Sequence, residues 1–500
     1  MFEINAPLMR AGAIVCFGAT LTACSTLPSY HVPHAAVPAQ FTSAPGTVAG
    51  WALAAPADGR PRGSWWTVFH DETLNRLEAR VNVSNQTVNQ AVARLAAARA
   101  ALDYQQGAEA PTVTAGTGAQ RYRTSKNLLD RALAGKTIPD YAAGAGVSWE
   151  PDLFGRVRNA TVAARDNVQV SEADLESVRL SVASQLATTY FDLRSLDRQK
   201  SLLDRTVATY EAGLHIVEQQ LADGAIDASP VAQAQAQLES ARMADQEIDG
   251  QRAQLQHAVA ALIGESASSF SLPPDVTPVT LPSIPVGVPS ALLERRPDIA
   301  AAERRVAAAN AGIGQARAAF YPSLTLSAST GLESTFFSPW LTAPSLFWSL
   351  GAQVAGVLFD GGRRDATLKG ADARYDEAVA AYRQTVLVAF QQTEDDLSAL
   401  RSLSQQAQSQ QRATAAAVSS LTLTTHRYQA GAVSYLDVVT TQSIALQNER
   451  TLEQITQRQL DTSVHLLQAL GGGWDRKMLR EGDALPSGAA TALNDGQTRG

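Results

Sequence analysis

The residues of this sequence that could carry out chemistry are few and poorly spaced for catalysis. The run Gly264 to Ser268 begins like a nucleophile elbow but lacks the second glycine and follows a predicted helix, not a strand. Of the seven histidines only His31 and His34 are three residues apart, and they lie in a segment predicted to be extended, not on a helix that could form a zinc site. There is no phosphate-binding P-loop. We therefore expect no enzyme, no metal site and no cofactor, and any energy would have to come from a partner.

One cysteine stands where covalent chemistry is expected. Met9-Arg10, an apolar run and the small residues before Cys24 have the order of a secretory signal, over residues 1–23. Leu21 to Cys24 resembles the lipobox of bacterial lipoproteins, which implies cleavage before Cys24 and acylation of its sulfur and new amino group. Ser25 in place of aspartate favours delivery to the outer membrane. The alternative is an ordinary signal peptide. Cys16 would be removed with the signal, so no intramolecular disulfide is possible.

Composition excludes some classes of protein. The net charge of -7 gives no basic footprint for nucleic acid. No run of 18 apolar residues occurs, so we expect no transmembrane helix in the mature chain. Charged residues at 18% and aromatic residues at 6% are sparse, which suits long helices packed through small side chains.

The most informative stretch is a helix that runs directly into a strand. From Ser290 apolar residues recur every three or four positions until Tyr321-Pro322, where proline ends the helix. From 323 to 333 the period becomes two. One face of that strand carries leucine, alanine and threonine; the other carries serine, threonine and glycine. Similar strands are predicted at about 112–123, 141–149 and 346–358, and residues 124–140 are expected to form a polar surface loop.

The second half of the chain repeats the first. Arg194-Ser195-Leu196 matches Arg401-Ser402-Leu403 at an offset of 207 residues, and the same offset aligns Gly264 with Gly471. We therefore predict a tandem duplication of helix, strand, strand, long helix and returning helix. The expected divisions are a lipoprotein signal peptide at 1–23, a lipid-anchored extended segment at 24–63, the first repeat at 64–271, a proline-rich linker at 272–289, the second repeat at 290–474 and a flexible tail at 475–500.

The strands have the length that crosses a bilayer at a tilt. A membrane tolerates no open sheet edge, and four strands are too few to close a barrel. Copies of the chain must therefore share one barrel; three copies would supply twelve strands, although spacing alone does not choose three over two or four. Heptad-like spacing in the long helices favours coiled coils packed side by side. Five aromatic residues near strand ends suit an interfacial girdle: Tyr141, Trp149, Tyr321, Phe347 and Trp348.

The chain resembles the outer membrane factors of tripartite efflux systems, which are TolC-like proteins, and in particular their NodT-type or OprM-like lipoprotein branch. The matching residues span the mature chain in order: Cys24, Trp65-Trp66, Asp152 to Arg156, Arg295 to Ile299, Ala319 to Leu324, Leu358 to Arg363, Tyr428, Gly431, Tyr435-Leu436 and Leu470 to Trp474. The resemblance implies an α+β membrane protein: a homotrimer with a twelve-stranded β-barrel shared by three protomers in the outer membrane and an α-helical coiled-coil tunnel in the periplasm.

The resemblance also implies partners and site residues. A periplasmic membrane-fusion adaptor and an inner membrane pump, usually of the RND class, would drive efflux of drugs or other toxic small molecules. The closed tip would place an apolar ring at Leu436. The position at which the family usually carries an acidic ring falls on Thr440, which is not acidic. Asp437, which is close to Leu436 in sequence, is the candidate to take over that role. Candidate adaptor contacts are the helical turns Gly224, Ala225, Ile226, Gly431, Ala432, Val433 and Ser434.

Two alternatives stay open. Within the family, the chain could serve as the exit duct of a type I protein-secretion system, against which the lipobox and the OprM-like motifs argue. From another class, it could be a long helical lipoprotein tether without a pore. The tether hypothesis predicts no shared barrel and leaves the four predicted strands unexplained.

Overall fold

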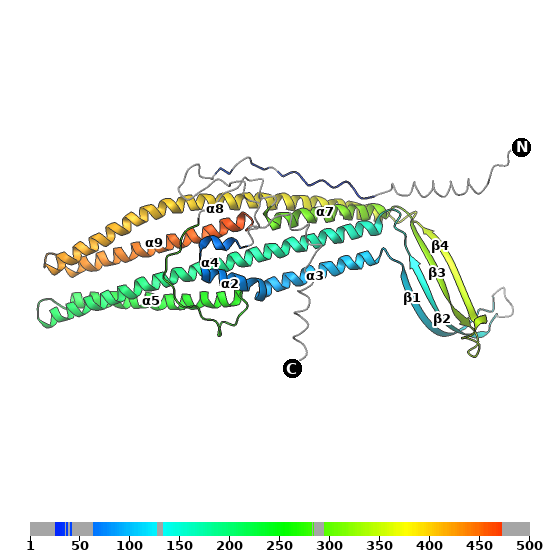
Figure 1. Cartoon of the computed structure of the whole chain (residues 1–500), viewed down its shortest axis with the longest axis horizontal. Helices are drawn as coiled ribbons and strands as arrows, with labels where there is room; N and C mark the ends of the chain where they lie inside the picture. The colour runs from blue at the N-terminus through cyan, green and yellow to red at the C-terminus, as the bar shows by residue number, and fades with distance from the viewer. Residues whose placement is uncertain are drawn as a thin grey trace. The chain divides into compact units, whose positions relative to one another are not determined.

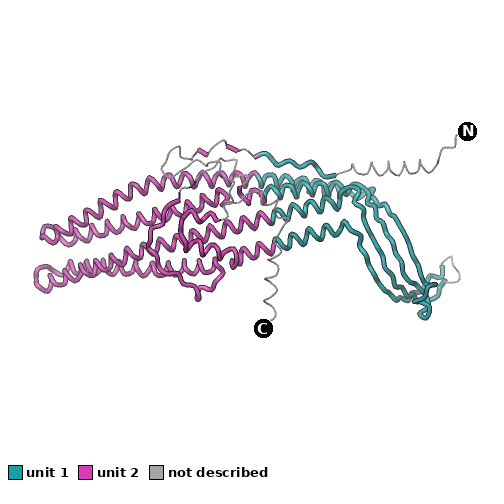
Figure 2. The backbone as a smooth tube through the Cα atoms, in the orientation of Figure 1, with its two compact units in different colours: residues 1–34, 95–171, 302–382 teal, residues 35–94, 172–301, 383–500 magenta. Residues whose placement is uncertain are grey.

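The computed structural model describes residues 26–35, 37–38, 41–42, 64–127, 134–282, 284 and 295–472. The chain divides into two compact units: unit 1 comprises residues 1–34, 95–171 and 302–382, and unit 2 comprises residues 35–94, 172–301 and 383–500 (Figure 2). The predicted signal peptide, Cys24 and the C-terminal tail lie outside the described residues.

Unit 1 contains one antiparallel sheet whose strands follow each other in chain order, β1-β2-β3-β4 (Figure 1). The strands are β1 (Thr112–Arg123), β2 (Thr137–Trp149), β3 (Ser323–Ser334) and β4 (Leu346–Ala355). No helix in the described part of the chain is both long and apolar enough to cross a bilayer.

Two strand boundaries differ from the predicted ones by more than one residue. β2 starts at Thr137, so the predicted loop at 124–140 loses its last four residues to the strand. The reason is pairing, because Arg123 lies opposite Thr137 and Gln120 opposite Asp140. β4 ends at Ala355 and not at 358, since Ala355 lies opposite Ser323, the first residue of β3.

The elements of the two halves correspond closely, which confirms the tandem repeat. α3 (Gln86–Gly107) and α7 (Pro297–Ala318) each have 22 residues, and the long helices α4 (Arg156–Ala222) and α8 (Arg363–Gln429) each have 67. The returning helices are α5 (Ser229–Leu262) and α9 (Tyr435–Ala469). In Figure 1 α5 runs back beside α4, and α9 beside α8.

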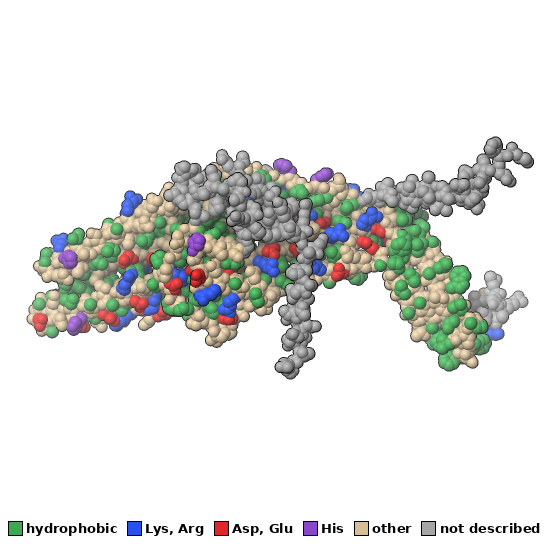
Figure 3. Space-filling model, viewed as in Figure 1, with side chains coloured by type: hydrophobic (Ala, Val, Ile, Leu, Met, Phe, Trp, Pro, Cys, Tyr) green, Lys and Arg blue, Asp and Glu red, His purple; other side chains and the backbone are tan. Residues whose placement is uncertain are grey.

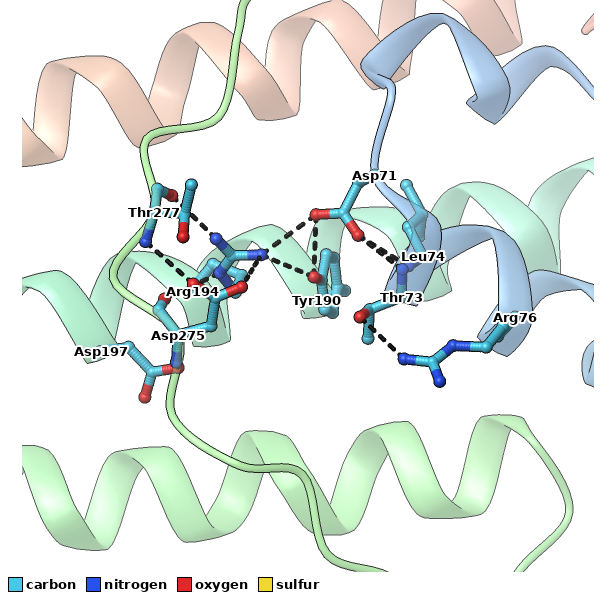
Figure 4. A network of polar contacts seen from close by, with 9 residues as sticks. All are labelled: Asp71, Thr73, Leu74, Arg76, Tyr190, Arg194, Asp197, Asp275 and Thr277. Carbon is cyan, nitrogen blue, oxygen red and sulfur yellow. Dashed lines mark hydrogen bonds and ion pairs between the residues drawn. The ribbon is translucent and has the colours of Figure 1, made fainter.

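A buried arginine ties three segments of unit 2 together (Figure 4). Arg194 on α4 is 3% exposed. Its guanidinium lies 3.0 Å from the Asp71 carboxylate and donates to the carbonyl oxygens of Asp275 and Thr277, at 2.8 Å each. Asp71 in turn caps α2 (Glu72–Ser84) by accepting from two backbone amides. Each of its three nitrogens donates to an oxygen atom, which makes the burial of this charge tolerable.

Each returning helix ends on a glycine that packs against the start of the short helix of the same repeat. Gly264 has a φ of +75°, and a Cβ placed on it would lie 2.2 Å from the carbonyl oxygen of Ser84. Gly471 has a φ of +89°, and its Cβ would lie 2.1 Å from the carbonyl oxygen of Arg295. The adjoining helix ends are held by side chains, since Asn85 donates to Leu262 O and Arg296 to Ala469 O. We call these two places the glycine joints.

Candidate functional site

One face of the sheet is apolar across all four strands. Directly opposed residues of antiparallel strands share a face, so the register defines it. One row of pairs joins Val113 to Val147, Val147 to Ala328 and Ala328 to Leu350. On this face Val113, Leu350 and Trp348 are exposed, by 69%, 76% and 71%. Figure 3 shows hydrophobic side chains gathered over these strands. A soluble surface rarely exposes such a continuous apolar face, and lipid is the environment that suits it.

The opposite face is built from small and polar residues. Ser329 and Ser349 are opposed on β3 and β4, and their hydroxyls lie 2.8 Å apart. The neighbouring row contains Gly116, Gly144 and Gly331 on three successive strands. The predicted two-faced strand pattern is therefore confirmed for the whole sheet. Such alternation is what a wall between lipid and a watery channel requires.

Phe347 differs from the interfacial role predicted for it. It lies opposite Gly331 on the polar face, whereas its neighbour Trp348 lies on the apolar face. A Cβ on Gly331 would come within 2.8 Å of the Phe347 ring and 2.7 Å of the Gly144 Cα atom. The glycine row thus makes room for the ring against the backbone. Sequence alternation alone predicts the opposite faces of residues 347 and 348, but not which face an aromatic ring suits.

In unit 2 the helical turns of the two repeats have the same geometry. Gly224 and Gly431 both adopt left-handed backbone, with φ of +72° and +73°. The next residue in each turn donates back to the helix, Ala225 to Gln220 O and Ala432 to Arg427 O, both at 2.8 Å. These are glycine C-caps that satisfy the last carbonyls of α4 and α8. Neither glycine has an atom within 4 Å of an added Cβ, so both turns are open on their outer side.

The two turns meet in one apolar cluster, which we call the turn cluster. Its buried members are Val217 and Ala234 from the first repeat and Tyr435 and Val438 from the second. Tyr428 packs against it and donates to Gln220 Oε1 at 2.9 Å. Gly213 gives Tyr435 space, because a Cβ there would lie 3.1 Å from its hydroxyl. The residues that carry the family resemblance include both tyrosines, but the sequence assigned them no role. Their position beside the turn glycines was the only sign of their importance.

The predicted gate and contact residues lie on and beside the start of α9. Leu436 is 55% exposed, and Thr440 is also exposed and one turn further along the same helix face. Asp437 is exposed as well, but its carboxylate forms a capping box with Ser434, accepting from the Ser434 amide and hydroxyl. These hydrogen bonds hold the pKa of Asp437 below its usual range. The carboxylate therefore remains charged at neutral pH while it fixes the start of α9. Of the predicted contacts, Gly224, Ala225, Gly431, Ala432 and Ser434 are exposed, whereas Ile226 and Val433 are half-buried.

The first described residues bind to a site in unit 1 formed by Phe154, Asn159 and Gly314, which we call the seat of Thr26. The Thr26 hydroxyl oxygen lies 2.8 Å from Phe154 O and 3.1 Å from Gly314 O, and accepts from Asn159. The Asn310 side chain donates to Pro28 O. A Cβ on Gly314 would lie 2.7 Å from Asn159 Nδ2 and 3.2 Å from the Leu27 Cα, so glycine is required there. The seat holds the segment that follows Cys24.

Long helices joined to a two-faced antiparallel sheet define the class of a membrane channel subunit. Within the described ranges, no group of three or more histidine, cysteine, aspartate or glutamate side chains is placed to hold a metal ion.

Comparison with known proteins gives the family. Residues 79–265 and 288–472 match the family described as outer membrane efflux protein, and the chain belongs to it. The chain is therefore an outer membrane channel component of an efflux system, not an enzyme. It is 30% identical over 466 residues to the cation efflux system protein CusC of Escherichia coli O6:H1, covering 92% of this chain and 98% of CusC.

Two further similarities agree with the family. Outer membrane protein OprJ of Pseudomonas aeruginosa is 32% identical over 460 residues, covering 91% of this chain and 94% of OprJ. The solved structure of the outer-membrane channel OprN is 27% identical with a TM-score of 0.81, covering 89% of this chain and 99% of that one. These confirm the predicted family and the predicted TolC-like fold of long helices, four strands and two repeats.

Proposed function

We propose that three copies of this chain form a passive exit duct for drugs or other toxic small molecules, anchored in the outer membrane through Cys24. The observation that carries the proposal is the open two-faced sheet, because β1 and β4 each have one unpaired edge within the described sheet. Unpaired backbone groups cost several kcal/mol each in hydrocarbon. Three copies close twelve strands, an even number within the observed range.

The partners follow from the family and from the turn regions. The sequence contains no P-loop, so we assign the energy supply to a periplasmic membrane-fusion adaptor and an inner membrane pump of the RND class. The open turns at Gly224 and Gly431 are the surface we assign to the adaptor. Among the relatives, CusC is named for cation efflux and ArpC for antibiotic efflux. Our choice of drugs and toxic compounds rests on the OprM-like resemblance of the sequence and on the antibiotic efflux for which ArpC is named, with cations as the competing cargo.

The test is complementation in a bacterium that lacks its own channel but keeps the adaptor and the pump. Expression of this chain should restore efflux of a fluorescent pump substrate and lower its accumulation about tenfold. The purified protein should be trimeric and conduct ions in a planar bilayer. A trimer that conducts but secretes only proteins would favour the type I alternative. A chain that neither conducts nor restores efflux would favour the tether.

The gate hypothesis makes a separate prediction. In the proposed trimer Leu436 narrows the resting tip, so Leu436→Ser should open it. We expect at least a tenfold rise in uptake of a large antibiotic that the outer membrane normally excludes. The matched control is Leu423→Ser, because Leu423 is similarly exposed, by 61% against 55%, but lies on α8 outside the predicted gate. Equal leakage in both variants would remove Leu436 from the gate.

A further inference from the structure

The charged side chains of the four strands are sorted by sign between the two faces of the sheet. The strands contain four of them: Arg121, Arg123, Asp140 and Glu333. Both arginines follow the spacing of two that starts at Val113, so they lie on the apolar face of β1. Asp140 lies opposite Gln120 and Glu333 opposite Ala142, which places both carboxylates on the polar face. The apolar face of the described strands therefore carries positive charge only.

The two arginines have no neighbour in the sheet that could neutralise them. Arg121 lies opposite Pro139 and Arg123 opposite Thr137, and neither of these residues is charged. Both arginines are exposed. Within the described ranges neither guanidinium forms an ion pair. Two free guanidinium groups on an otherwise apolar face need an anion from outside the chain.

Two lysines extend this charge beyond the ends of the strands. Lys126 and Lys136, both exposed, lie just after β1 and just before β2. The backbone amide of Thr124 donates to Lys136 O at 2.9 Å, so the pairing of the hairpin continues past the strand ends and keeps the lysines near the arginines. We call Arg121, Arg123, Lys126 and Lys136 the basic rim. The corresponding segment of the second hairpin, residues 335–345, contains no charged residue.

An aromatic cluster lies next to the basic rim. The ring of Tyr141 is 5.4 Å from that of Phe337 and 5.9 Å from that of Trp340. Tyr141 lies opposite Ala119, on the same face as Arg121, which is two residues or about 7 Å further along β1. The apolar face thus passes from aliphatic to aromatic to cationic side chains toward this end. Hydrocarbon, interface and head groups of a lipid leaflet follow each other in the same order.

The position of the rim along the strand agrees with a head-group level. Arg121 comes eight residues after Val113, which is about 27 Å of strand or about 21 Å of membrane thickness at a tilt of ~40°. The lipid-facing band of such proteins is about 25 Å tall. The rim is at the end of the sheet away from the places where α3 and α7 join the strands (Figure 1). Because the helices extend into the periplasm, this end reaches the outer leaflet.

We propose that the basic rim binds the phosphate groups of a phosphorylated glycolipid in the outer leaflet, whose acyl chains lie on the apolar face below Tyr141. The inference goes beyond the proposed function and rests only on the outer membrane location. Guanidinium groups bind phosphate through two parallel hydrogen bonds, and lysines add point charges. Four cations at the end of one hairpin exceed the charge of a lipid with a single phosphate. A head group with several phosphates matches them.

The test is a lipid titration of the purified full-length protein in detergent, followed by native mass spectrometry. The probe is lipid A, a disaccharide lipid with two phosphates. Arg121→Gln combined with Arg123→Gln should weaken binding of lipid A about thirtyfold, since each cation at an anionic surface contributes a factor of about five. Arg121→Lys combined with Arg123→Lys keeps the charge and should stay within about fivefold of the unaltered protein.

The matched control removes the same charge elsewhere. Arg363→Gln combined with Lys369→Gln replaces two exposed cations at the start of α8, at the opposite end of the strands, and should leave lipid A binding unchanged. Equal weakening in this control would show that only the net charge matters and would overturn the site. Equal affinity of the unaltered protein for phosphatidylglycerol, which has one phosphate, would overturn the assigned ligand.

The outcomes for this inference and for the proposed function are independent. A chain that restores efflux but does not bind lipid A overturns the lipid site and leaves the exit duct standing. A chain that binds lipid A through the rim but does not restore efflux overturns the duct and supports the lipid site.

Discussion

Alanine at Gly264 or at Gly471 is expected to destabilise the protein by about 3 kcal/mol for each substitution. Two costs add at the glycine joints. Left-handed backbone strains any residue with a Cβ, by about 1–2 kcal/mol. In addition the new methyl group would lie 2.2 Å from Ser84 O or 2.1 Å from Arg295 O, so a backbone segment must move. Thermal unfolding of the detergent-solubilised protein measures the loss.

The control separates the two costs. Gly224 has a similar φ of +72° but nothing within 4 Å of an added Cβ. Gly224→Ala should therefore show the backbone strain alone, about 1–2 kcal/mol. If Gly264→Ala and Gly224→Ala lower the midpoint equally, the close approach to Ser84 contributes nothing and the joint is not a packing constraint.

Replacing Glu78 by glutamine is expected to stabilise the protein by about 3 kcal/mol at pH 7. Glu78 on α2 is fully buried, and neither carboxyl oxygen has a hydrogen-bond partner within the described residues. Burial raises the pKa of Glu78 to about 9, from an ordinary value of 4.5. The folded protein therefore holds the proton between these two values, whereas the unfolded chain releases it. The free energy of unfolding is therefore highest, as far as Glu78 determines it, below about pH 4.5. It falls progressively as the pH rises to about 9.

The measurement is the unfolding midpoint at pH 5, 7 and 9. The difference between Glu78→Gln and the unaltered protein should grow with pH across this range, because glutamine cannot ionise. Glu72→Gln is the matched control, since Glu72 is exposed on the same helix. A pH-independent difference, or the same trend in the control, would show that Glu78 is not the titrating group.

The faces of the sheet were predictable because strand periodicity is a local property. Leu324, Leu326 and Ala328 follow each other at spacing two, and no partner strand is needed to place them together. The start of β2 was not predictable in this way. Residues 137–140 become strand because β1 is long enough to pair with them, and that pairing joins Thr137 to Arg123 across a connecting segment.

In the turn regions the glycines were predictable and the packing was not. Gly224 and Gly431 interrupt long helical patterns, and left-handed caps are the usual reason. Tyr435 carries no comparable local signal. Its burial depends on Val217 and Ala234, which come from helices some 200 residues away in sequence, and on the missing side chain of Gly213. The roles of Leu436, Asp437 and Thr440 in a gate remain predictions, because a closed tip involves several copies of the chain.

The seat of Thr26 has a consequence for the order in which the protein matures. The Thr26 hydroxyl contacts both Phe154 O and Gly314 O, and Gly314 lies 288 residues after Thr26 in the chain. Half of the seat belongs to each repeat, so the seat does not exist until both repeats have folded and met. The segment that begins at Thr26 is therefore among the last parts of the chain to find its place. Docking of this segment therefore requires both repeats to be in place.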